Sequence, residues 1–160
     1  MNTPTPLTTA LLAEWRQIRQ LTYDYLDLLE PHQLDLRLSF PTSQTLGYQF
    51  WCMVGAHESF LNALEQGGWQ GFHSSLDDFD EVTPAVIKAQ MQKSDERLLL
   101  LCEILNLDPP RVGQEPGYKS IFRMIEHEMH HHGQLINFLF CHHLPIPPSW
   151  ADEWALSYDE

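Results

Sequence analysis

Residues 126–134 read EHEMHHHGQ and place four histidines and two carboxylates within nine consecutive positions. The helical pattern around them runs roughly from Tyr118 to Leu144, so this segment covers about two and a half turns of a helix. His127 and His131 are four residues apart, which puts both imidazoles on one face, about 6 Å apart along the axis. Two imidazoles in this arrangement can bind one transition metal ion, and neutral imidazole suits zinc, nickel, copper or iron. A stable site needs a third ligand from another part of the chain.

Three further helical patterns make up most of the remaining chain, so the sequence predicts an all-α protein. They run roughly over residues 9–29, 45–66 and 83–105, each with apolar residues at helical spacing. Four amphipathic helices predict a single four-helix-bundle domain over residues 1–160, with a long connection between the second and third helices. The breaks that separate the patterns are rich in proline or glycine: Pro31, Gly67-Gly68, Pro109-Pro110 with a loop over 110–116, and Pro145.

The composition limits the partners and the compartment. Hydrophobic residues make up 43% of the 160 residues, which is enough for a core, and the formal net charge is −13. Such a charge repels nucleic acid and anionic membranes. We expect no signal peptide at residues 1–6, and the apolar runs are too short to cross a bilayer. An odd number of cysteines in helical patterns is typical of reduced thiols, so we expect a cytoplasmic protein: Cys52, Cys102 and Cys141.

The second helical pattern offers two candidates for the third ligand, Cys52 and His57. On a helical wheel, His57 lies near the centre of the apolar face, whereas Cys52 lies on its shoulder among small residues. Two arrangements follow. In one, shoulder residues meet and Cys52 joins His127 and His131. In the other, core-facing residues meet and the group is His57, Glu128 and His132, and the periodicity leaves both open.

Three segments resemble the DinB/YfiT-like proteins. Residues 130–134, HHHGQ, are similar to the His-His-Arg-Gly-Gln signature of that family. Residues 45–50, TLGYQF, resemble the segment that leads to the family's first metal histidine. Residues 144–150, LPIPPSW, resemble its usual ending after the fourth helix. The order and spacing of the three segments extend the resemblance over nearly the whole chain.

The resemblance implies a four-helix bundle that forms a homodimer and holds nickel or zinc on three histidines, with open positions for water or substrate. Characterised relatives are thiol-dependent transferases and isomerases that use mycothiol, bacillithiol or glutathione, and others are assigned as hydrolases. The two ligands of the fourth helix map onto His127 and His131. The family's histidine on the second helix maps onto Cys52, and its arginine maps onto His132. A Cys52 thiolate would complete a Cys-His-His site, His57 would replace it after a shift, or the site is lost.

Two functional hypotheses follow. In the first, the chain is a metal-dependent enzyme, a thiol-dependent transferase or hydrolase of a small molecule, whose zinc or nickel is held by His127, His131 and either Cys52 or His57. The second nitrogens of the ligand imidazoles would then be supported by residues such as Glu128 and His132. In the second hypothesis, the chain is a non-catalytic dimeric bundle that binds a small molecule or a protein partner. The sequence identifies no catalytic residue.

Overall fold

The computed structural model describes residues 4–108 and 115–159. The segment 109–114, which holds Pro109-Pro110 and most of the expected loop, lies outside the described residues, as do residues 1–3 of the expected N-terminal segment. The described part is helical and its extended pairing is limited to one isolated bridge, between Arg37 and Thr45. The all-helical prediction is therefore confirmed. The elements are α1 (Pro6–Leu26), η1 (Pro31–Asp35), α2 (Leu46–Gln66), η2 (Ser75–Asp78), α3 (Pro84–Ile104), α4 (Tyr118–His142) and α5 (Pro148–Trp154).

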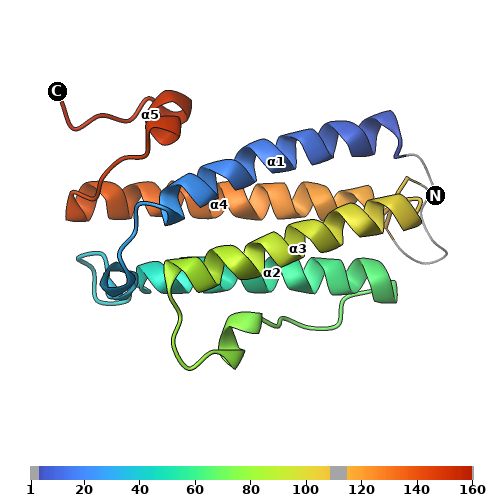
Figure 1. The fold of residues 1–160 in the computed structure, drawn as a ribbon, viewed down its shortest axis with the longest axis horizontal. Coiled ribbons are helices and arrows are strands. Elements are labelled where there is room, and N and C mark those ends of the chain that lie inside the picture. The colour runs from blue at the N-terminus through green and yellow to red at the C-terminus, as the bar shows by residue number, and fades with distance from the viewer. Residues whose placement is uncertain (1–3, 109–114, 160) are drawn as a thin grey trace.

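The four long helices pack together. Helix α2 packs against both α3 and α4, and α1 packs against the same two helices, so α1 and α2 lie diagonally opposite each other. Helices α2 and α3 run in the same direction because the segment 67–83 returns along the outside of α2 (Figure 1). None of the described helices is long and apolar enough to cross a membrane.

Each of the helices α1, α2 and α3 begins directly after a threonine that caps its first turn. The hydroxyls of Thr5, Thr45 and Thr83 each accept a hydrogen bond from a backbone N–H in the first turn of α1, α2 and α3. The sequence predicts the first helix over residues 9–29, but α1 begins three residues earlier, at the capped Pro6, and ends at Leu26. Pro31 disfavours a helical conformation for the residue before it, so the chain leaves the helix before Glu30.

The C-terminal segment forms a further short helix, α5, which is not among the four predicted helical patterns. Trp150 on α5 is fully buried, and its Nε1 donates a hydrogen bond to the carbonyl of Leu21, 2.6 Å away. Helix α5 therefore closes one side of the bundle against α1.

Two apolar clusters fill the interior. One contains Phe50, Phe138 and Trp150, and the other contains Trp15 and Leu61. On every long helix, buried or half-buried polar residues lie between the members of one cluster and those of the other: Arg19 on α1, His57 on α2, Ser94 and Asp95 on α3, and Glu128, His131 and His132 on α4. A polar layer therefore crosses the middle of the bundle, and the candidate site residues belong to it or border it.

The backbone conformation at the C-terminus of α2 can be tested by substituting its two glycines. Gly67 has a left-handed conformation with φ of 76°, whereas Gly68 is not in this region and has open space where a Cβ would be added. We expect Gly67→Ala to lower the free energy of unfolding by about 1 kcal/mol, because a Cβ strains this conformation. Gly68→Ala is the control and should change it much less in urea unfolding. Equal effects would contradict the assigned C-cap.

Candidate metal centre

Cys52, His127 and His131 come together where α2 faces α4. One ligand atom from each residue lies within 4.8 Å of the other two. The Sγ of Cys52 is 3.7 Å from Nε2 of His127, and the imidazole centroids of His127 and His131 are 4.6 Å apart. Sulfur and nitrogen ligands of a tetrahedral zinc ion are about 3.5 Å apart, given bond lengths of about 2.3 and 2.0 Å. The sulfur–nitrogen distance of 3.7 Å is therefore close to that of two ligands of one metal ion, and the third ligand atom is within 4.8 Å of both.

Gln49 orients one of the two histidines. Nδ1 of His131 lies 2.9 Å from Oε1 of Gln49, and both side chains are buried. Because an amide oxygen only accepts, Nδ1 carries the proton and Nε2 keeps its lone pair. A hydrogen bond of this kind typically fixes the tautomer and the ring orientation of a metal-binding histidine. Gln49 lies one turn before Cys52 on α2, so the same helix supplies a ligand and the support for another ligand.

Burial keeps both histidines neutral, which is the form that binds metals. Burial, with the nearby ring of His57, lowers the pKa of His127 to about 4. Burial, with the nearby ring of His127, lowers the pKa of His131 to about 3. Burial raises the pKa of the Cys52 thiol, so this group must lose its proton when a cation binds. Nδ1 of His127 is buried and has no hydrogen-bond partner within the described chain.

A cavity of about 590 Å³ lies over the three residues. One wall comes from α2 and α4, and the other comes from the loop that precedes α2. The volume is within the range of small-molecule sites. The lining residues are Leu38, Phe40, Thr42, Ser43, Gln44, Tyr48, Gln49, Cys52, His127, His130, His131, Gln134, Asn137 and Phe138.

The loop wall of the cavity is held in place by its own hydrogen bonds. The backbone of Arg37 pairs with that of Thr45, and the Arg37 guanidinium donates to the carbonyl of Ser43. The Ser43 hydroxyl accepts from the backbone N–H of Leu38 at 2.9 Å. Nε2 of His142 donates to the Arg37 carbonyl across 2.8 Å, which ties the loop to the end of α4. The cavity is therefore formed by ordered backbone on both sides.

His57 has other partners. The Arg19 guanidinium contacts its Nδ1 through Nη2, and its Nε2 lies 3.1 Å from Oε2 of Glu128 without an aligned hydrogen bond. Both ring nitrogens thus face charged groups of the bundle interior, and burial with the Arg19 charge lowers the His57 pKa. The structure places His57 outside the Cys52–His127–His131 group, although its ring centroid is 6.3 Å from that of His127.

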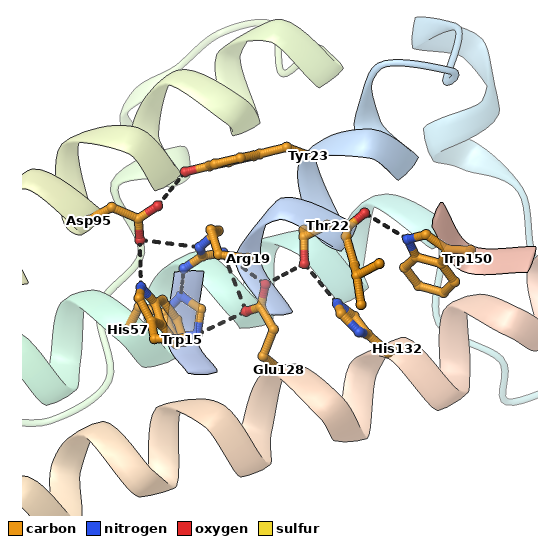
Figure 2. Close-up of polar contacts among 10 residues, drawn as sticks. Trp15, Arg19, Thr22, Tyr23, His57, Asp95, Glu128, His132 and Trp150 are labelled. Carbon is orange, nitrogen blue, oxygen red and sulfur yellow. Dashed lines mark hydrogen bonds and ion pairs between the residues drawn. The ribbon is translucent and has the colours of Figure 1, made fainter. Parts of the chain in front are cut away.

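Arg19 contacts two of the three residues of the second arrangement, His57 and Glu128. Figure 2 shows its guanidinium between Glu128, His57 and Asp95. Nη1 donates to Oε1 of Glu128 at 3.0 Å, and Nε donates to Oδ1 of Asp95 at 3.2 Å. Burial alone would raise the pKa of Glu128, but Arg19 and His57 outweigh burial and hold it well below its usual range. Arginine is therefore the cation that satisfies Glu128.

Glu128 and His132 support the interior rather than the ligand imidazoles. The hydroxyl of Thr22 donates to Glu128 and accepts from Nε2 of His132, which is 2.8 Å away. The His132 ring packs on Trp150, with centroids 4.7 Å apart. The sequence suggests both residues as supports for His127 and His131, but the structure gives no hydrogen bond between these pairs in the described chain, and Gln49 has that role for His131.

Comparison with known proteins addresses the fold. No family model matches the chain, and no curated protein matches it. The crystal structure of a DinB-like protein from Bacillus cereus ATCC 10987 superimposes with a TM-score of 0.68, covering 86% of this chain and 93% of that chain at 20% identity. The chain has the DinB-like fold. The resemblance drawn from the sequence is confirmed at this level, and the metal centre depends on the geometry described above.

Sequence reasoning misses two residues, Arg19 and Gln49. A signal for Arg19 exists, because it takes a core position in the repeat formed by Leu12, Trp15, Arg19, Thr22 and Leu26. A charge at such a position is rarely buried without a partner, so it predicts a buried carboxylate elsewhere. Gln49 precedes Cys52 by three residues on a helix, which places both on neighbouring parts of one face.

The buried ion pair predicts a large stability effect. We expect Glu128→Gln in the metal-free protein to lower the free energy of unfolding by about 3 kcal/mol, because it leaves the Arg19 charge without its closest carboxylate. Glu126→Gln is the matched control, since Glu126 is exposed on the same helix, and it should change stability by less than about 0.5 kcal/mol. Urea unfolding of both variants provides the comparison, and a small effect of Glu128→Gln would contradict the described network.

Proposed function

We propose that this chain is a metal-dependent enzyme built on a DinB-like four-helix bundle, with zinc or nickel held by Cys52, His127 and His131. The observation that carries the proposal is the convergence of three ligand atoms within 4.8 Å at the wall of a cavity of about 590 Å³. A structural metal site would be closed by a fourth protein ligand, whereas a catalytic site keeps a position for water or substrate. Three ligands beside a cavity favour the catalytic type.

The proposed reaction is a thiol-dependent transfer or a hydrolysis, with a small molecule as the substrate. When bound, the ion would supply Lewis acidity and lower the pKa of a coordinated thiol or water toward neutrality. The protein's own contribution is positional. Gln49 fixes the orientation of His131, and the ordered loop over 37–45 limits the volume open to a substrate. The family resemblance supports the choice of these two reaction types.

Metal content tests the ligand set. We expect elemental analysis of the untagged, metal-loaded chain to give about one zinc or nickel per chain, and both Cys52→Ala and His131→Ala to lose it. Gln49→Leu should weaken the affinity by about 10–100-fold through loss of the support for His131. His130→Ala is the control, because His130 lines the cavity but is not among the three grouped residues. Retention of metal in His131→Ala would contradict this site.

Activity tests the enzymatic part of the proposal. A panel that pairs low-molecular-weight thiols with electrophiles, together with ester and amide substrates, should reveal turnover in the metal-loaded chain. His131→Ala should abolish this turnover, while His130→Ala should retain it. Turnover that is unchanged in His131→Ala would reject the metal-dependent mechanism. A wild-type chain that binds no zinc or nickel after reconstitution would instead favour the non-catalytic binding protein.

A further inference from the structure

The cavity over Cys52, His127 and His131 is lined by residues without a formal charge apart from the ligand group itself. No lysine, arginine, aspartate or glutamate lines its described wall. Other cavities of the described chain differ, because Arg123, Lys88 and Lys93 each line one of three others. A fourth, of about 90 Å³, is also lined by uncharged residues but is much smaller, so this site is the larger of the two described cavities without a charged side chain.

The rest of the molecule opposes anions at this position. The formal net charge is −13. The cation closest along the chain to the loop wall is Arg37, whose guanidinium is already engaged by the carbonyl of Ser43. A carboxylate that enters this cavity would lose water without gaining an ion pair, and this loss is costly for a charged group. A bound metal ion with its thiolate ligand would attract a negative charge of the ligand only at the atom that coordinates the metal.

The wall offers neutral hydrogen-bonding groups and apolar surface instead. The amide of Gln134 contacts Nε2 of His130 at 3.1 Å through one end, while its other end, the buried Oε1, has no partner within the described chain. Asn137 and Gln44 add two more amides along the cavity. Phe40 and Phe138 contribute apolar surface. Amides satisfy hydroxyl and amide groups of a ligand as donors and as acceptors.

We propose that this cavity binds a small molecule whose only charged atom is the one that coordinates the metal. The rest of the molecule is uncharged and carries hydroxyl or amide groups that form hydrogen bonds with the amide side chains of the cavity. This inference rests on the proposed function and narrows its substrate class. For a thiol-dependent reaction, it means that the thiol carries no carboxylate, so that thiols bearing carboxylates bind weakly.

A matched pair of thiols provides the test. N-acetylcysteine and N-acetylcysteinamide differ only in the replacement of a carboxylate by a neutral amide. We expect titration calorimetry on the zinc-loaded chain to give at least about tenfold tighter binding for N-acetylcysteinamide. Added salt should narrow this difference, because it screens the repulsion of the carboxylate.

Two variants with one added positive charge distinguish the effect of the cavity wall from the effect of the protein's net negative charge. Asn137→Arg adds a cation to the cavity at an exposed position of α4, and Gln92→Arg adds the same charge at an exposed position of α3 that lines another cavity. We expect Asn137→Arg to favour N-acetylcysteine over N-acetylcysteinamide about tenfold more than Gln92→Arg does, as measured by the ratio of the two dissociation constants. This comparison cancels intrinsic differences between the two thiols.

The outcomes are distinct. Equal or tighter binding of N-acetylcysteine by the wild-type chain, equal ratios in the two variants, or no binding of either thiol would overturn the uncharged-ligand inference. Metal content of the same samples reports on the proposed function separately. A chain without metal that still prefers N-acetylcysteinamide would support the inference about the cavity and contradict the metal site.

Discussion

The ion pair between Arg19 and Glu128 in the middle of the bundle constrains the rest of the structure. Both side chains are almost fully buried, and the guanidinium also contacts His57 and Asp95, so its partners come from α2, α3 and α4 (Figure 2). A buried charge without its partner is strongly destabilising, so the four helices can pack only in a register that brings these groups together. The ion pair thus selects one arrangement among those that the apolar faces alone would allow.

The position of the candidate metal centre follows from this register. Glu128 is adjacent to His127 in α4, so fixing Glu128 against Arg19 turns His127 and His131 toward α2. His57 is held by the same network, and Cys52, more than a turn earlier on α2, is the residue that meets the two histidines. The structure therefore contains two neighbouring polar groups. One is the interior layer around Arg19, and the other is the Cys52–His127–His131 group at the wall of the cavity.

Much of the fold can be predicted from local signals, whereas the division between these two polar groups cannot. Threonine caps, prolines and glycines lie close to the helix ends, and the spacing of His127 and His131 predicts their common face. The choice between Cys52 and His57 depends on the partner of each side chain across the bundle, and helical periodicity within one helix does not contain this information. The helix α5 and the role of Gln49 also depend on contacts with distant residues.

The coordination sphere of a loaded ion tests the central claim most directly. X-ray absorption spectroscopy of the zinc-loaded wild-type chain should show one sulfur at about 2.3 Å and two imidazole nitrogens at about 2.0 Å, with a light atom in the remaining position. A sphere of nitrogen and oxygen alone would exclude Cys52 as a ligand. Such a result would contradict the assignment of the metal centre to the interface of α2 and α4 described here.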